Sequence, residues 1–268
     1  MIHELNHFGI FVRDLEEALN FFRDGFGFEV VFHKLNEKTN TDIVYLQVAG
    51  GMIELLAPRT PNADQKFGVD HIAFLSNDLD ADYERLVGMG AGELERPRVA
   101  GTGEGRLAYV TDPNGASVEL IQRDLVMRKA KPVEHEHIVA FDHYSMYAND
   151  LAAARRFYQE GLGMKNLITW PIPERNLVID YLHYGYDVLE LLHEGQAMDS
   201  QFPHFALRVK NVDAAVESLA QKGINPSVEP WPLKVGTGKQ VQFTDSNGVT
   251  VELLDRVDLR ELEAPADA

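Results

Sequence analysis

Apolar and polar residues follow the same order in four segments of the chain. Each segment begins with a short strand-like run, continues with apolar positions at helical spacing, and ends in about three strand-like runs separated by turn signals. The pattern predicts four copies of a β-α-β-β-β unit. These units span residues 3–57, 68–123, 139–193 and 202–256.

The predicted helices have recognisable starts and ends. In the first unit, Asp14 and Glu17 have the spacing of a capping box, and Leu15, Ala18 and Phe22 fall on one apolar face. The other three helices are expected to start after Asp78, Asp150 and Asn211. Glycines that are expected to end the four helices are Gly25, Gly88 or Gly90, Gly161, and Gly223.

Four such units pair naturally into two α+β domains, each with two small sheets that curl around a shared cleft. We expect an N-terminal domain at 3–124, a linker at 125–138, a C-terminal domain at 139–256 and a solvated tail at 257–268. Pairing of adjacent units is the simple arrangement, whereas a swapped arrangement would join the first unit to the fourth.

Composition narrows the class of protein. The 268 residues are 45% hydrophobic and carry a formal net charge of −17, which predicts a sizeable core and argues against nucleic-acid or anionic-membrane partners. No apolar run has the length of a membrane span, and no leader is recognisable, so a cytoplasmic location is expected. With no cysteine, thiolate metal sites and cysteine nucleophiles are excluded.

Each unit carries one histidine in its first strand and one glutamate in its last. The separation within a unit is 47 or 48 residues in all four copies. The pairs are His7 and Glu54, His71 and Glu119, His143 and Glu190, and His204 and Glu252.

Strand parity predicts that these side chains face the clefts. In "VEL" the Val and Leu flanking Glu119 point to one face of the sheet, and Glu119 points to the other. Each cleft of two units therefore holds two histidines and two glutamates. A lone buried carboxylate costs several kcal/mol, but two carboxylates are neutralised by a divalent cation. Nitrogen and oxygen ligands suit Zn, Ni, Co, Mn or Fe(II).

The alternative reading is that each histidine is an ordinary core or surface residue. That reading fits a single pair, but it accounts less well for four pairs at one spacing. Tyr147 shares the parity of His143 and is expected in the second cleft, which Arg208 and Gln242 also have the position to reach. His183 and His193 flank the strands of the third unit. The glycine-rich segments 101–106 and 236–240 are interpreted as ordinary loops that lead into a strand.

The chain resembles the vicinal oxygen chelate superfamily, which includes glyoxalase I, methylmalonyl-CoA epimerase, extradiol dioxygenases and bleomycin resistance proteins. The resemblance rests on "DHIAF", "FFRDGFGF", "FYQEGLGM" and "DPNGASVELIQ" and covers about residues 3–256. It implies a divalent metal that chelates two neighbouring oxygens of a small substrate. The metal positions implied are His7, Glu54, His71 and Glu119 in one half, and His143, Glu190, His204 and Glu252 in the other.

The complete His-Glu-His-Glu set resembles glyoxalase I most closely. The resemblance implies proton transfer on a small hydroxy-carbonyl compound, as in an isomerase, epimerase or lyase. The base would be a coordinating glutamate, that is Glu54, Glu119, Glu190 or Glu252. A monomer or a homodimer is expected, since the chain resembles a fused dimer of the shorter enzymes.

Two other functions stay open at this point. Four-unit chains are typical of Fe(II)-dependent extradiol dioxygenases, in which His143, His204 and Glu252 would hold the iron. A small-molecule-binding protein of the resistance type is the third hypothesis, although that branch commonly lacks the metal ligands.

Overall fold

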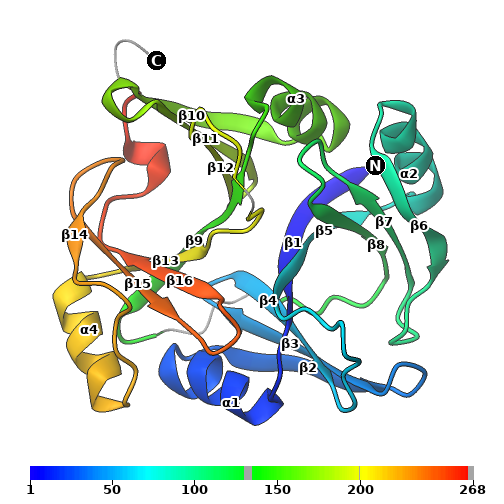
Figure 1. Ribbon diagram of the computed structural model, residues 1–268, viewed down its shortest axis with the longest axis horizontal. Helices are drawn as coiled ribbons and strands as arrows, with labels where there is room; N and C mark the ends of the chain where they lie inside the picture. The colour runs from blue at the N-terminus through cyan, green and yellow to red at the C-terminus, as the bar shows by residue number, and fades with distance from the viewer. Residues whose placement is uncertain (130–134, 199, 265–268) are drawn as a thin grey trace.

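The computed structural model describes residues 1–129, 135–198 and 200–264. These residues form two eight-stranded sheets, and each sheet is strongly curved (Figure 1). The strand orders are β2-β3-β4-β1-β5-β8-β7-β6 and β10-β11-β12-β9-β13-β16-β15-β14. The predicted α+β class and the four repeated units are confirmed, and the units pair with their neighbours in sequence.

The first sheet and its helices come from the first two units. The first unit contains β1 (Ile2–Phe11), α1 (Leu15–Leu19) with a π-helical continuation (Asn20–Gly25), β2 (Glu29–Asn36), β3 (Thr41–Val48) and β4 (Gly51–Pro58). The second unit contains β5 (Gly68–Ser76), α2 (Leu79–Gly88), β6 (Gly92–Val99), β7 (Arg106–Thr111) and β8 (Ser117–Gln122).

The second sheet repeats this arrangement. The third unit contains β9 (Ile138–Tyr147), α3 (Leu151–Arg155) with a π-helical continuation (Arg156–Gly161), β10 (Lys165–Ile172), a 3₁₀ turn (Pro173–Arg175), β11 (Leu177–Tyr184) and β12 (Asp187–His193). The fourth contains β13 (Phe205–Val209), α4 (Val212–Gln221), β14 (Trp231–Pro232), β15 (Lys239–Thr244), β16 (Thr250–Leu254) and a last 3₁₀ turn (Leu259–Glu261).

The predicted helix caps are confirmed, and the helices end at or shortly before the predicted glycines. The side chains of Asp14, Asp78, Asp150 and Asn211 each accept a hydrogen bond from a backbone N–H of the first turn. Gly90 and Gly223 adopt the left-handed conformation just after their helices. In the other two helices the predicted Gly25 and Gly161 are the last residues of the π-helical continuations, and the left-handed residues are Gly27 and Gly163, two positions farther on.

Strand β14 is much shorter than the corresponding strands β2, β6 and β10. It has two residues, whereas each of the other three has eight. Pro230 and Pro232 lie in this segment, and proline has no backbone N–H to contribute to a ladder. This edge of the second sheet is therefore mostly irregular.

The two sheets share one hydrophobic core because α1 and α3 lie between them, each in contact with its own sheet at β4 or β12. The π-helical continuation of α1 packs on the second sheet, where Phe22 lies 6.3 Å from Phe205 and Phe26 lies 5.5 Å from Phe243 between ring centroids. The continuation of α3 packs on the first sheet, where Tyr158 donates to Asp112 at 3.1 Å. In Figure 1, α1 and α3 lie at the boundary between the two sheets. The convex faces are covered, and the concave faces are left to the clefts.

The segment after β8 packs against both sheets, where the sequence predicts a linker. The guanidinium of Arg128 donates to the backbone carbonyls of Leu5 and Asn6, both at 3.0 Å, and to Asp187 at 2.6 Å. Residues 130–134 of the predicted linker and 265–268 of the predicted tail lie outside the described residues. Leu259, within the predicted tail, is buried.

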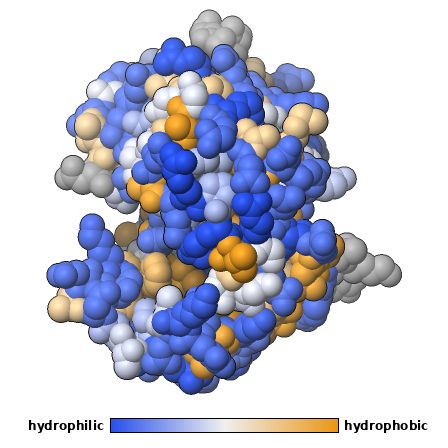
Figure 2. Space-filling model, turned by 90° about the vertical axis from the view of Figure 1, so that its right-hand side faces the viewer, coloured by the Kyte–Doolittle hydropathy of each residue, from blue (hydrophilic) through white to orange (hydrophobic). Residues whose placement is uncertain are grey.

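The surface fits the acidic, polar composition. Figure 2 shows a mainly hydrophilic face on which apolar residues are scattered, with a hollow between its upper and lower parts. None of the described helices combines the length and apolar character needed to span a membrane.

Substitution of Tyr144 tests how much the contact between the two sheets stabilises the fold, because the side chain of this residue hydrogen-bonds across the two sheets. Its hydroxyl, fully buried, donates to the carbonyl of Met52 at 2.8 Å and accepts from the N–H of Met52 at 3.1 Å. Tyr144→Phe removes both bonds and leaves two buried backbone groups unpaired, so we expect the free energy of unfolding to fall by about 1–3 kcal/mol. Urea denaturation measures the change. Tyr186→Phe, at an exposed tyrosine, is the control and should leave the midpoint unchanged.

Candidate metal centres

The first centre lies on the four central strands of the first sheet. His7 and His71 come from β1 and β5, and Glu54 and Glu119 come from β4 and β8. One ligand atom of each residue lies within 4.8 Å of the others, and all four residues are buried. The register brings them together, because Gly9 of β1 is paired with both Glu54 and His71, and Ala73 of β5 is paired with Glu119.

The distances in this centre suit a cation better than direct hydrogen bonds. The Nε2 atom of His7 lies 3.4 Å from Oε2 of Glu54 and 3.6 Å from Oε2 of Glu119. The Nε2 atom of His71 lies 3.5 Å and 3.4 Å from the same two oxygens. Ligands that bind one cation at about 2.1 Å lie about 3.0–3.4 Å apart. The four atoms are thus close to the separation of a ligand set.

Three of the ligand atoms at the first centre make no hydrogen bond to the described residues. Nε2 of His7, Nε2 of His71 and Oε2 of Glu119 are buried and have no hydrogen-bond partner among the described residues. A buried polar atom without a partner costs free energy. A divalent cation would satisfy all three, so the residues fit a metal ion.

Neighbouring side chains orient both imidazoles toward the centre. The Nδ1 atom of His7 lies 3.0 Å from Oδ1 of Asn6, and that of His71 lies 3.0 Å from Oδ2 of Asp70. With Nδ1–H donating to these oxygens, each ring presents the lone pair of Nε2 to the centre. Arg123 donates to the same oxygen of Asn6 at 3.0 Å and so holds it in place.

Gly9 makes room for the second imidazole. A Cβ atom built at Gly9 would overlap the ring of His71, which lies directly over this residue. The backbone of β1 therefore forms part of the wall of the centre. A larger residue at this position would displace His71.

The charges of the first centre depend strongly on one another. Burial lowers the pKa of His7 below its usual value. Burial opposes the charged form of His71 as well, but Glu119, Asp70 and Glu54 together raise the pKa of His71 well above its usual range. Burial would raise the pKa of Glu54, and the two histidines outweigh it and hold that pKa well below its usual range. Binding of a divalent cation requires both imidazoles in their neutral form.

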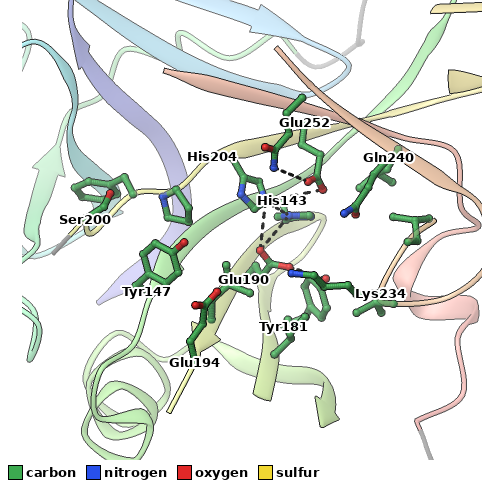
Figure 3. A pocket seen from close by; sticks show the side chains of 18 of the residues that line it. His143, Tyr147, Tyr181, Glu190, Glu194, Ser200, His204, Lys234, Gln240 and Glu252 are labelled. Atoms are coloured by element: carbon green, nitrogen blue, oxygen red, sulfur yellow. Dashed lines mark hydrogen bonds and ion pairs between the residues drawn. The ribbon is translucent and has the colours of Figure 1, made fainter. Parts of the chain in front are cut away.

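The second centre is built from the corresponding strands but is not identical. His143 from β9, Glu190 from β12 and His204, one residue before β13, have ligand atoms within 4.8 Å of one another. Glu252 from β16 is farther out, with its Oε1 atom 4.0 Å from Nε2 of His204 (Figure 3). The geometry thus gathers three of the four predicted residues closely and sets Glu252 beside them.

Hydrogen bonds already use most polar atoms of the second centre. Nε2 of His143 lies 3.2 Å from Nε2 of His204. Glu190 accepts from Ser145 at 2.6 Å and from Tyr181 at 2.7 Å, one bond to each oxygen. Glu252 accepts from Gln242 at 3.2 Å.

A buried ion pair supports His143 from behind. Its Nδ1 atom lies 2.8 Å from Oδ1 of Asp142, which also accepts from Arg256 at 2.6 Å. Burial opposes the charged imidazole, but Glu190 and Asp142 raise the pKa of His143 to about 10. Burial likewise opposes the charged form of Glu190, yet the two histidines hold the pKa of Glu190 well below its usual value.

Each centre opens into a cavity large enough for a small ligand. The cavity at the first centre has a volume of about 380 Å³, and Glu54, Glu119 and residues of the predicted 101–106 loop line it. The cavity at the second has about 370 Å³, and its walls include Tyr147, Gln242 and Gln240 from the predicted 236–240 loop. Arg208 instead pairs with Asp258 at 3.0 Å, and His193 bonds to the carbonyl of Ala148.

The sequence pattern did not reveal three of the four cross-strand partners of the glutamates, and it indicated only that Gln242 could reach the second cleft. Tyr45, Tyr109, Tyr181 and Gln242 lie directly opposite Glu54, Glu119, Glu190 and Glu252 on neighbouring strands. Each precedes its glutamate by nine or ten residues in the sequence. That spacing is a signal for the hairpin partner, but it becomes readable only once the hairpin register is known.

A family model identifies both halves of the chain. The model described as "Glyoxalase/Bleomycin resistance protein/Dioxygenase superfamily" matches residues 4–120 and 140–253. The expected relationship is therefore confirmed.

Curated relatives match less than half of the chain. A lactoylglutathione lyase of Salmonella typhimurium is 32% identical over 124 residues, which is 43% of this chain and 92% of that enzyme. A putative lactoylglutathione lyase of Brassica oleracea is 33% identical over 125 residues, which is 43% of this chain. The match spans only 44% of the plant protein's own length.

Solved structures match the whole fold. The Mn(II)-bound glyoxalase from Novosphingobium aromaticivorans has a TM-score of 0.71 at 18% identity and covers 99% of this chain and 87% of that one. A variant of homoprotocatechuate 2,3-dioxygenase from Brevibacterium fuscum has a TM-score of 0.70 at 17% identity, covering 95% and 72%. At these identities the likeness establishes the fold.

Substitution of Gly9 tests whether the position of His71 matters for metal binding at the first centre. Gly9→Ala places a Cβ against His71 and displaces the imidazole, so we expect the affinity of this centre for Mn²⁺ to fall by about 10–100-fold, the range seen when ligand orientation is lost. Equilibrium dialysis with elemental analysis measures the bound metal. Gly88→Ala is the control, because a Cβ there meets open space. Unchanged Mn²⁺ binding in Gly9→Ala would contradict the assigned role of His71.

Proposed function

Because the chain belongs to the glyoxalase/bleomycin resistance protein/dioxygenase superfamily, we propose that it is a divalent-metal-dependent enzyme that moves a proton on a small hydroxy-carbonyl substrate. The observation that carries this proposal is the first centre, in which two imidazoles and two carboxylates aim at one point beside a cavity. An isomerase, epimerase or lyase fits this arrangement. The lactoylglutathione lyases among the relatives favour the lyase.

The metal and a carboxylate base would both contribute to removal of the substrate proton. A bound divalent cation supplies Lewis-acid polarisation of a substrate carbonyl, which acidifies a proton on the neighbouring carbon. Glu119 is placed to accept that proton, since its Oε2 atom faces the centre and has no hydrogen-bond partner among the described residues. The same carboxyl can return the proton to the same or the adjacent carbon, so the reaction needs no oxidant or reductant.

Tyr109 keeps the base in position. Its hydroxyl donates to Oε1 of Glu119 at 2.7 Å, which leaves Oε2 as the oxygen that faces the centre. Glu54 lies within 3.5 Å of both imidazoles and has the position of a permanent ligand. In this proposal Glu54 acts as the permanent metal ligand and Glu119 as the base.

Glu119→Gln tests the role of the base. The amide keeps the size of the side chain but cannot accept a proton, so we expect turnover to fall by about 10²–10⁴-fold, the usual contribution of a general base. The measurement is uptake of solvent deuterium next to the carbonyl, followed by mass spectrometry on a panel of hydroxy-carbonyl compounds that includes S-lactoylglutathione. The wild type should exchange at least one member of the panel.

Glu104→Gln is the matched control for this experiment. Glu104 lines the same cavity, lies outside the four-residue centre and pairs with Lys34 at 3.6 Å. Exchange should survive in this variant. Equal rates in Glu119→Gln and the wild type would refute the role given to Glu119.

The second centre favours one other reaction class. Two histidines and one carboxylate, His143, His204 and Glu190, form the donor set of many non-haem Fe(II) oxygenases. The carboxylate in the compact group is Glu190, whereas the sequence reading named Glu252 for this role. Oxygen consumption with a catechol panel after anaerobic loading with Fe(II) separates the two functions. Uptake of oxygen that His143→Ala abolishes would favour the dioxygenase.

A further inference from the structure

We propose that the two centres are unequal metal sites: the first binds a divalent cation tightly with four residues, and the second binds it more weakly with three and leaves Glu252 uncommitted. This inference rests on the proposed function, because both require a metal-binding chain. Positions in the two halves of the molecule are directly comparable, because the order of the strands is equivalent in the two sheets.

The imidazole nitrogens that face the first centre have no hydrogen-bond partner in the described part of the chain, whereas those that face the second centre bond to each other. In the first, both Nε2 atoms have no hydrogen-bond partner among the described residues. In the second, the Nε2 atoms of His143 and His204 lie 3.2 Å apart and share a hydrogen bond. A cation entering the second centre must break that bond before either lone pair is available, which weakens net binding.

One substitution between the halves explains part of the difference. Ser145 stands two residues after His143, where the first half has Gly9 two residues after His7. The hydroxyl of Ser145 donates to Oε2 of Glu190 at 2.6 Å, and this is the oxygen that lies 3.4 Å from both imidazoles. The ligand atom of Glu190 is thus already engaged, while the first half has no side chain at this place.

A second substitution sets the position of the last glutamate. Tyr109 donates to Oε1 of Glu119, so that Oε2 stays 3.4 Å from His71. At the equivalent place Gln242 donates to Oε2 of Glu252 at 3.2 Å, and the other oxygen lies 4.0 Å from His204. The bond to the shorter glutamine holds the carboxylate of Glu252 beside β15, farther from the imidazoles than Glu119 is in the first centre.

A third substitution loosens the second histidine. Three of the four histidines follow a residue whose side-chain oxygen holds their Nδ1 atom, namely Asn6, Asp70 and Asp142. His204 follows Pro203, which offers no such oxygen, and His204 is 8% exposed where His71 is fully buried. Loss of an outer partner of this kind costs about 10–100-fold in metal affinity.

As a consequence, the carboxylates of Glu252 and Glu119 differ in their availability to a bound substrate. Glu252 lines the second cavity and is not needed to complete the compact group, so its carboxylate is available to a bound substrate. In the first centre, Glu119 becomes available only when it leaves the ligand set. A carboxylate in the first cleft therefore has to give up a metal bond before it can contact substrate, whereas the one in the second cleft does not.

Titration of the metal-free chain with Co²⁺ tests the inequality, with visible absorption as the readout and a chelator as competitor. We expect two phases whose dissociation constants differ by at least about 10-fold. His71→Ala should abolish the tight phase and keep the weak one. His204→Ala should have the opposite effect, and the two variants together assign each phase to a centre.

Exchange of the cross-strand residue tests the cause. Gln242→Tyr should draw Glu252 into the ligand set and tighten the weak phase by about 10-fold or more, with a change in the cobalt spectrum. Thr244→Tyr is the control, because Thr244 lies two residues along the same strand face and is exposed. Tyr109→Phe, which keeps the ring, should weaken the tight phase.

Each outcome decides between the proposals. Two phases that respond to these variants as described support the inequality. Two equal phases, or a weak phase that Gln242→Tyr does not tighten, overturn it and leave the proposed function standing. A chain that binds no Co²⁺ overturns both.

Discussion

The burial of two imidazoles and two carboxylates on the central strands of one sheet is the constraint on which the structure depends. Such groups are costly inside a protein unless they neutralise one another or bind an ion. In the first centre the four ligand atoms lie 3.4–3.6 Å apart in neighbouring pairs, and three of them have no other partner among the described residues. The sheet is thus organised around a position where a divalent cation would balance these buried groups.

The rest of the fold protects this arrangement. The packing of α1 and α3 between the two sheets fills the convex faces, as the contacts of Phe22 with Phe205 and of Tyr158 with Asp112 show. The sheets are tied further by Tyr144 and Arg128. Because the core is on the convex side, both concave faces remain open to cavities of similar size.

The repeat made much of this readable from the sequence. Four histidine–glutamate pairs at one spacing predicted the units, their strands and the eight residues at the two centres. The contact of α1 and α3 with both sheets was not readable, since apolar faces such as that of Phe22 do not specify which sheet they cover. The outward position of Glu252 was also hidden, because it depends on Gln242, which lies opposite it only after the hairpin forms. The shortness of β14 was not predicted, because the fourth unit was expected to have the same strand-like runs as the others.

The most direct test of the account is anomalous diffraction from crystals grown with Mn²⁺. The account predicts a strong anomalous peak within bonding distance of Nε2 of His7, Nε2 of His71, and the carboxylates of Glu54 and Glu119. Crystals that diffract well but show no anomalous peak at these four residues, with the side chains bonded to water or to one another, would contradict the account.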